Sequence, residues 1–313
     1  MTQYLDVDTQ AQFIPTIIAQ KALGRFANYM NLAKTVARDS ELTTQSVGDT
    51  ISVPKRGTLV AQDKVKNVDA SVQDPTADNV QVVLDTHKHV TFGIEDVAQV
   101  LQNQTAQDGY AEDAGIALAE AVEGALAGLY ASLTATPITF DNTNDASIDA
   151  SMRAVRKYFT TQKVPKLEQR HLYVNDIYDE ILSVDKFAKY DSRGGGESQE
   201  ITSGLLRPIY NLKTFESQSV VQTGADPILE HGLAYTRDAF VLATRPLPNV
   251  PAGHGAVSKV ITDPDTNVTI RVTSWYDGRG KALVISLDLL FGTAVMDQRR
   301  AVEVQLSTPA VSS

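Results

Sequence analysis

The sequence predicts an α+β fold in which one dominant helix accompanies a sheet whose strands are distributed along the chain. Residues 105–134 place apolar side chains on a single helical face, over a longer stretch than any other segment. Strand-like segments occur on both sides of this helix and follow one another closely in the C-terminal third. A polar stretch at about residues 60–79 separates two of these strands and predicts a ribbon with an exposed tip.

A first helix is predicted within residues 13–37. Pro15 suits the first turn, where the missing N–H of proline costs nothing. The apolar stripe that predicts this helix consists of residues 14, 18, 22, 26, 29 and 30.

Residues 48–96 are predicted to form a long two-stranded arm. Apolar and polar residues alternate at both ends of the segment, as at Ile51 and Val53 and again at Val80 and Val82. Further on, Val90, Phe92 and Ile94 continue the alternation. A two-stranded ribbon alone is marginal in water, because it buries too little surface to offset the ordering of the chain. Another segment must therefore cover the arm, and a neighbouring copy of the chain is the natural candidate.

The long helix at residues 105–134 is expected to span roughly 45 Å, at about 1.5 Å per residue. Gly124 and Gly128 lie one turn apart on a face of small residues. Because glycine weakens a helix interior, these two positions predict the close approach of a sheet or another helix. The alternative is a pair of tolerated surface glycines. The apolar stripe consists of Ala114, Leu118, Ala121, Val122, Ala125 and Leu129.

The remaining segments alternate between helices, strands and loops. A loop at residues 134–147 precedes a helix whose inward residues are Ile148, Met152, Val155 and Phe159. "RHLYVND" predicts a buried strand that leads into a helix capped by Asn175. Residues 190–200 are predicted to form a flexible glycine-rich loop. The strand signals that follow include a hairpin at residues 273–292, with an Asp-Gly turn.

Composition excludes several classes of protein. The 313 residues contain 38 acidic and 28 basic side chains, a formal charge of −10, and no Lys/Arg-rich block. A protein that coats nucleic acid through its phosphates usually shows a basic surface, so if DNA lies nearby this chain is more suited to contain it than to grip it. Cysteine is absent, which excludes disulfides and thiolate metal sites. The first residues have no signal-peptide pattern. No continuous apolar run approaches the roughly 20 residues that are needed to span a bilayer, so the chain is predicted to be soluble.

A search for catalytic motifs finds no nucleophile elbow, no P-loop and no zinc-protease helix. His87 and His89 share one face of a predicted strand and form a possible metal pair, but a solvated strand face is the simpler interpretation. "DNTND" and "DPDTN" lack the glycine and closing glutamate of a calcium loop and are interpreted as turns. The acids near Asp176 and the pair Glu95-Asp96 have no convergent partner. We therefore predict no catalytic, cofactor or metal site.

The order of the segments resembles the major capsid proteins of tailed bacteriophages, which have the Hong Kong 97-type fold. The resemblance covers nearly the whole chain. It is carried, in order, by "FIPTIIAQKALGRFANYMNLAKTVARD", "GDTISVPKRG", "VTFGIEDVAQV", the alanine-rich helix, "RHLYVNDIYDEILS", "GLLRPIYNLKTFES", "LAYTRDAFVLATRPL" and "SLDLLFGTAVMDQRRAVEVQ". The divisions that it implies are an N-terminal arm (1–40), an extended loop (41–94), a peripheral domain with the spine helix (95–144), an axial domain (145–260) and a return to the peripheral domain with a C-terminal strand (261–313).

This resemblance also implies which residues meet other subunits. In the extended loop they are Lys55, Arg56, Lys64, Lys66 and Asp74, and in the axis-facing loop they are Arg193, Gly194, Gly195 and Gly196. Some relatives join subunits by a Lys–Asn isopeptide bond; lysines are available in the loop here, but no matching Asn and Glu can be named. Asp288 and Gly292 match the closing pattern, and we expect Asp288 to satisfy local backbone donors and Gly292 to permit a turn.

The function implied is that of a structural protein and not an enzyme. Hexamers and pentamers of the chain would form an icosahedral shell around double-stranded DNA, without sequence-specific binding and without a membrane. The expected partners are further copies, a portal protein, a separate scaffolding protein and possible decoration proteins, in a virion assembled in the host bacterial cytoplasm. The alternatives are an encapsulin-like compartment shell and a metal-dependent hydrolase that uses His87, His89 and an acid.

Overall fold

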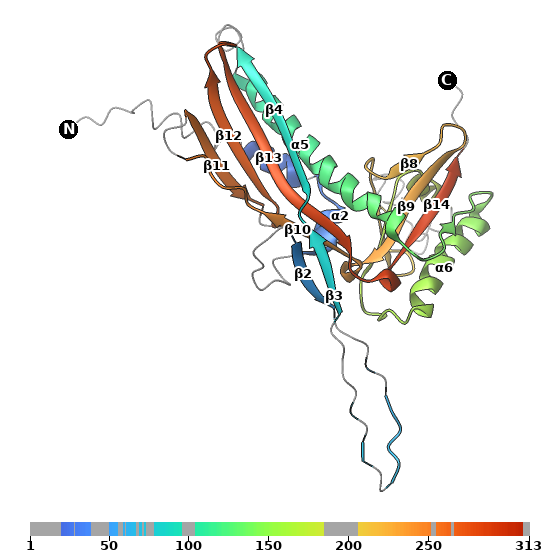
Figure 1. Cartoon of the computed structure of the whole chain (residues 1–313). Helices are drawn as coiled ribbons and strands as arrows, with labels where there is room; N and C mark the ends of the chain where they lie inside the picture. The colour runs from blue at the N-terminus through green and yellow to red at the C-terminus, as the bar shows by residue number, and fades with distance from the viewer. Residues whose placement is uncertain are drawn as a thin grey trace, which may run out of the picture.

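Two six-stranded sheets and a separate two-stranded ribbon form the framework of the chain. The structure is a computed structural model. It describes residues 20–27, 29–38, 50–55, 59, 61–66, 69–70, 72, 78–95, 104–184, 206–251, 255–263 and 266–308. Within these ranges the α+β class is confirmed, because one long helix lies along the first sheet and shorter helices accompany the second (Figure 1).

The first sheet is built around one long central strand, β13 (Ala282–Val295). Ten positions of β13 pair with β4 (Thr86–Glu95). The other strands that pair with β13 are β12 (Thr269–Asp277) and β10 (Phe240–Arg245), and all three pairings are antiparallel. The order β1-β10-β13-β12-β11 is completed by β1 (Ala37–Arg38) and β11 (Ala256–Thr262). The predicted hairpin at residues 273–292 is confirmed as β12 and β13.

Helix α5 (Gln104–Ala127) and the 3-10 helix η1 (Gly128–Ser132) together form the predicted long helix. In Figure 1 this helix lies along one face of β13 and β4, and the three elements contact one another. Its apolar stripe is packed in the main core, which confirms the helix and its inward face. The buried residues of the helix include Ala111, Ala114, Leu118, Ala119, Val122, Leu126 and Ala127.

The close approach that was predicted at Gly124 and Gly128 occurs at a different glycine of this helix. A Cβ added to Gly124 or Gly128 would meet nothing within 4 Å, so these are open surface positions in the described structure. The close approach occurs instead at Gly115, where an added Cβ would lie 2.3 Å from the carbonyl oxygen of Ala22. The N-terminal helical segment therefore crosses α5 at Gly115, about two turns before Gly124.

The sequence predicted no apolar segment long enough to span a membrane, but part of this helix meets that criterion. Gly109–Ser132 is long and apolar enough by length and composition, with a mean hydropathy of 1.3 in its most apolar window. The helix that crosses the core of a soluble protein meets the same criterion, and 44% of this window is buried inside the chain. Its packing against the first sheet accounts for that apolar character.

The second sheet has the order β5-β14-β9-β6-β7, with β8 paired to β9. Helix α6 (Asp145–Thr161) buries Ile148, Met152, Val155 and Phe159 against it, as predicted. Strand β6 is buried along its whole length and leads into α7 (Asp176–Ser183), which is also as predicted. The strands are β5 (Ile138–Thr139), β6 (Arg170–Val174), β7 (Leu212–Glu216), β8 (Val221–Thr223), β9 (Ile228–Thr236) and β14 (Ala301–Thr308).

Strands that are neighbours in sequence often join different sheets. Strand β10 and most of β11 lie within residues 145–260 and pair in the first sheet, whereas β14 lies within residues 261–313 and pairs in the second. Strand β4 pairs with β13 along its whole length. An apolar pattern identifies a strand without identifying the sheet that it joins, so the chain crosses between the layers more often than the sequence indicates.

The N-terminal helix is interrupted at residues 30–31, within the range predicted to be helical. Residues 20–27 and 29 are helical, and a separate short helix, α2 (Leu32–Thr35), follows. Ala22, Phe26 and Met30 are fully buried, as predicted, whereas Tyr29 is half-exposed. Residues 14 and 18 lie outside the described residues.

A buried carboxylate joins this N-terminal segment to the main core. Glu123 of α5 is 1% exposed, and its two oxygens accept hydrogen bonds from the backbone N–H groups of Leu32 and Ala33, both at 3.0 Å. The hydroxyl of Tyr173 in β6 donates to the same carboxylate at 3.1 Å. A single side chain thus connects α5, α2 and the second sheet.

A second buried carboxylate has the same role at α7. Glu230 in β9 accepts hydrogen bonds from the N–H groups of Asn175, at 2.6 Å, and Ile177, at 3.1 Å. The side chain of Asn175 makes no capping hydrogen bond, so the predicted cap is wrong. The carboxylate that satisfies the start of α7 comes from a strand that is distant in sequence, and local spacing could not reveal it.

Replacing Glu123 tests its structural role. Glu123→Ala leaves two backbone donors and one hydroxyl buried without their acceptor, which we expect to lower the free energy of unfolding by roughly 3 kcal/mol. Urea unfolding of the unassembled subunit measures this change. Glu120→Ala, at an exposed position of the same helix, is the matched control, with an expected loss of less than about 0.5 kcal/mol. Equal losses in both variants would contradict the role of Glu123.

The same carboxylate predicts a pH dependence. Burial raises the pKa of Glu123 above its usual value of 4.5, and the hydrogen bonds from Ala33, Leu32 and Tyr173 offset part of that effect. The folded state therefore holds this proton more tightly than the unfolded state, so the stability contributed is full below pH 4.5 and is lost as the pH rises through the folded pKa. The stability difference between the native protein and Glu123→Gln should shift in favour of the variant as the pH rises. A difference that is constant between about pH 4 and pH 8 would exclude this linkage.

Candidate functional site: the projecting ribbon

Strands β2 (Thr50–Lys55) and β3 (Asp78–Val83) form an antiparallel ribbon whose root is packed against the first sheet. Ile51, Val53 and Val82 are fully buried and form a small core with Val241 and Ala243 of β10. We call β2, β3 and the described residues between them (59, 61–66, 69–70 and 72) the projecting ribbon. Contrary to the sequence prediction, its root is covered by the chain itself.

The described residues beyond the root are all exposed. Figure 1 shows the described tip segments, in blue, well apart from both sheets. Three of the exposed side chains are large and apolar, namely Leu59 at 65%, Val65 at 62% and Val72 at 95% exposure. The opposite face of the root is also open, because Ser52 and Val83 alternate with the buried residues. The ribbon therefore leaves apolar side chains in water for which this chain provides no cover in the described structure.

The root is held in place by a close crossing of two backbones. A Cβ added to Gly292 of β13 would lie 2.1 Å from the carbonyl oxygen of Val83, at the end of β3. Gly292 lies within a strand, paired with Ala243, and not in the turn that the sequence predicted. Its lack of a side chain lets the ribbon pass directly over the first sheet.

Asp288 also has a different role from the predicted one. It does not cap backbone donors; its carboxylate receives two hydrogen bonds from Arg271 of β12, at 3.0 and 2.5 Å. The ring of His87 in β4 lies 3.2 Å from the same carboxylate. Asp288 therefore bridges the two strands that flank β13, and Arg271 also reaches the carbonyl oxygen of Pro248 at 2.8 Å. This cluster stiffens the polar face of the sheet.

The described residues show neither a metal site at His87 and His89 nor a calcium site at the Asp/Asn-rich segments. His87 is engaged with Asp288, and the described residues contain no group of three or more His, Cys, Asp or Glu side chains that could hold a metal ion. The first Asp/Asn-rich segment is a turn, as predicted; in the second, Asp263 accepts a hydrogen bond from the N–H of Thr266 at 2.9 Å, and residues 264–265 lie outside the described residues. Asp141 accepts hydrogen bonds from the N–H and hydroxyl of Thr143, and Asn144 caps α6 through the N–H of Ser147.

Few of the residues predicted to contact other subunits fall within the described structure. Lys64 and Lys66 do, and both are exposed on the ribbon, where the Lys64 ammonium donates to the carbonyl oxygen of Val65 at 3.1 Å. The Lys55 side chain, Arg56 and Asp74 lie outside the described residues. The axis-facing loop, Arg193, Gly194, Gly195 and Gly196, lies outside them as well.

The sequence search missed the buried carboxylates Glu123 and Glu230. A sequence signal existed for each, because an isolated glutamate lies among alanines and leucines in the long helix and another lies inside the apolar strand "ILEHGLAY". Buried carboxylates are rare without partners. An acid on an apolar face therefore indicates a distant backbone donor, although it does not identify which donor.

The architecture can be compared with known proteins. Neither a protein-family model nor a curated protein matches the chain. Among solved structures, a chain from the mature capsid of bacteriophage PhiM1 matches with a TM-score of 0.59 and 11% identity over 89% of this chain and 87% of that one. A chain from Mycobacterium phage Che8 matches with a TM-score of 0.56 and 16% identity over 89% and 90%.

The chain has the fold of tailed-phage major capsid proteins. A further match comes from a virus-like particle of Pyrococcus furiosus, with a TM-score of 0.51 and 9% identity over 92% of this chain and 96% of that chain. The matches span nearly the whole length of each chain that is compared, so the likeness concerns the overall fold and not one part of it. At these identities the likeness is one of fold.

Gly292→Ala tests the backbone crossing at the root of the ribbon. The added methyl group collides with the backbone of Val83, which cannot move aside like a side chain, so we expect a loss of roughly 2 kcal/mol and faster hydrogen exchange in β2 and β3. The control is Gly93→Ala in β4, because its added Cβ would meet Ala282 and Val284 at an ordinary 3.8 Å. Unchanged exchange in β2 and β3 of Gly292→Ala would show that the crossing does not hold the ribbon.

Proposed function

We propose that the chain is a major capsid protein that assembles into hexamers and pentamers of an icosahedral shell around phage double-stranded DNA. The observation that carries this proposal is the projecting ribbon, which is anchored to its own sheet at one end and exposes apolar side chains beyond it. A two-stranded segment that is exposed in this way buries too little surface to be stable alone, so it gains stability by packing against a partner. The fold shared with phage capsid proteins favours further copies of the same chain as that partner.

In the proposed shell the projecting ribbon lies across a neighbouring subunit. Leu59, Val65 and Val72 would be covered there, and Lys64 and Lys66 would lie at the polar rim of the contact. The loop containing Arg193 and Gly194–Gly196 would face the five-fold and six-fold axes, and residues 1–40 would form an arm. The two sheets and α5 would supply the rigid plate.

The proposed role is structural, with no catalysis and no cofactor. The formal charge of −10 suits a shell that contains DNA without gripping its phosphates. The proposed partners are a portal protein, a separate scaffolding protein and possible decoration proteins, with assembly in the host bacterial cytoplasm and a final location in the virion. The described structure gives no support to a metal-dependent hydrolase.

A compartment shell of the encapsulin type is the second candidate. The match to a virus-like particle from Pyrococcus furiosus covers nearly all of both chains and favours a shell of this kind as the alternative. The two candidates differ in their contents. Particles isolated from the native source should contain double-stranded DNA if the chain is a phage capsid protein, and an enzyme cargo if it forms a compartment.

Assembly of the purified protein tests the proposal. We expect large closed particles by electron microscopy and sedimentation. In one variant an Asn-Gly turn replaces residues 56–77, which joins Lys55 to its pairing partner Asp78 and keeps the root intact. This variant should remain folded by circular dichroism and should assemble at least about tenfold less, because the cross-subunit contact is gone.

A matched variant retains the full length of the ribbon. Leu59→Ser, Val65→Ser and Val72→Ser together remove only apolar surface, and we expect a smaller reduction in assembly from them. A native protein that stays a compact monomer at high concentration would overturn the proposed function. Normal particles from the shortened variant would overturn the role of the ribbon.

A further inference from the structure

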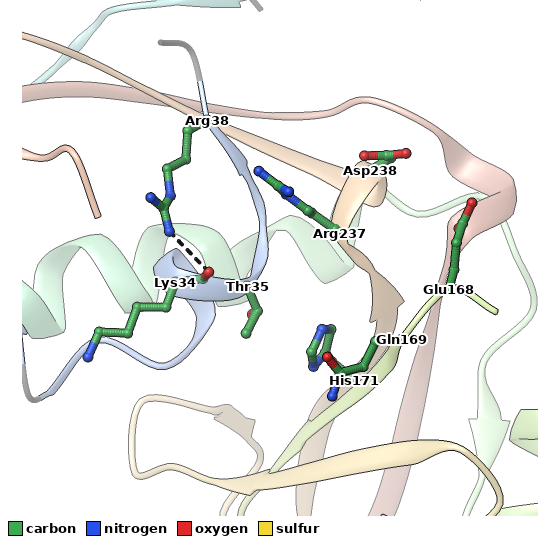
Figure 2. Close-up of a pocket in the computed structure, with 8 residues that line it drawn as sticks. All are labelled: Lys34, Thr35, Arg38, Glu168, Gln169, His171, Arg237 and Asp238. Carbon is green, nitrogen blue, oxygen red and sulfur yellow. Dashed lines mark hydrogen bonds between the residues drawn. The ribbon is translucent and has the colours of Figure 1, made fainter. Parts of the chain in front are cut away.

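A pocket of about 450 Å³ lies where the N-terminal segment meets the second sheet. Figure 2 shows that its walls come from α2 and β1 on one side and from η2 (Arg237–Ala239) and the start of β6 on the other. Its lining residues are Lys34, Thr35, Arg38, Glu168, Gln169, His171, Arg237 and Asp238.

The pocket is positively charged within an acidic chain. Lys34, Arg38 and Arg237 line it, against the carboxylates of Glu168 and Asp238. Arg300 behind the wall already pairs with both acids, at 3.4 Å from Asp238 and in a shorter contact with Glu168. Arg300 also lies 3.4 Å from Asp297, so its single charge is shared among three acids. The three basic and two acidic side chains that line the pocket leave a small positive balance.

Two buried nitrogen atoms in this wall have no hydrogen-bond partner in the part of the chain that the structure describes. They are Nε of Arg38, a donor, and Nδ1 of His171, whose role depends on the tautomer of the ring. Arg38 makes one hydrogen bond, from Nη2 to the carbonyl oxygen of Lys34 at 3.2 Å, which leaves the rest of its planar fork for another group. Buried polar atoms without partners are rare and point to a missing ligand.

His171 is an ordered group and not a surface side chain. It is 6% exposed, and its ring packs against Phe215 and Tyr235 at centroid distances of 5.6 and 5.3 Å. In Figure 2 the ring is directed toward the space between Thr35 and Arg237. Burial, with a smaller contribution from Lys213, lowers the pKa of His171 to about 4, so near neutral pH the ring is uncharged and donates one N–H.

We propose that this pocket receives a carboxylate side chain from a second copy of the chain, held by Lys34, Arg38 and His171. The inference rests on the proposed shell function, since it requires that copies meet. A carboxylate matches the planar fork of an arginine and fills a small pocket, whereas the backbone of a DNA duplex requires a long basic surface. The chain supplies 38 carboxylates and no extended basic surface.

Carbodiimide cross-linking of assembled particles tests the proposal directly. The reagent joins an amine to a carboxylate only where the two are already in contact. Particles are assembled from equal amounts of ¹⁴N- and ¹⁵N-labelled protein, so that mass spectrometry identifies linkages between copies. We expect Lys34 to be joined to an Asp or Glu of another copy in particles, and this linkage to be absent in unassembled subunits.

The matched control is Lys34→Arg, which keeps the positive charge but has no amine to cross-link. This product should disappear from the variant, while the cross-links formed by other lysines remain. Arg38→Ala should raise the protein concentration needed for assembly roughly tenfold. Lys157→Ala, which removes an exposed positive charge from α6, should change that concentration less than about twofold.

Three results would overturn the inference. In the first, Lys34 forms no linkage in particles. In the second, it links only to carboxylates of its own copy, such as those in residues 1–19. In the third, it becomes reactive only after nuclease treatment, which would assign the pocket to nucleic acid. If no particles form, the proposed shell function fails instead. Particles that form with an unlinked Lys34 reject this pocket contact and leave the shell function intact.

Discussion

A two-stranded ribbon can be covered on only one face by the sheet to which it is anchored, and this constraint governs the rest of the molecule. Ile51, Val53 and Val82 are buried against β10, and Gly292 lets the backbone of β3 pass over β13 at a distance that no side chain would permit. Beyond its root, the described residues of the projecting ribbon are all exposed, so the body of the chain does not bury them. A ribbon of this kind gains stability by packing against another molecule.

Buried carboxylates connect distant segments within the body of the chain. Glu123 ties α2, α5 and β6 together, Glu230 fixes the start of α7, and Asp288 bridges the strands beside β13. Each carboxylate satisfies donors from segments that are far apart in sequence. Such an arrangement favours a plate that keeps its shape while its edges adapt to different neighbours, which a closed shell with two kinds of symmetry axis requires.

Local sequence patterns predicted the elements better than their arrangement. The helical stripe from Ala114 to Leu129 and the alternation in β12 and β13 depend on neighbours in sequence, and both predictions are confirmed. The partition of β4, β10 and β14 between two sheets depends on pairings with distant strands, which periodicity does not encode. Gly292 and Glu123 illustrate the same limit, because each is explained by a backbone group from another part of the fold.

Hydrogen exchange at the projecting ribbon tests the central claim most directly. Amides of residues 61–66 and 69–70 should exchange rapidly in the unassembled subunit and become strongly protected in particles, whereas those of β13 should be protected in both states. If the ribbon amides are already protected in the isolated subunit, or remain fast in intact particles, then these residues do not pack against a neighbouring copy and the account is wrong.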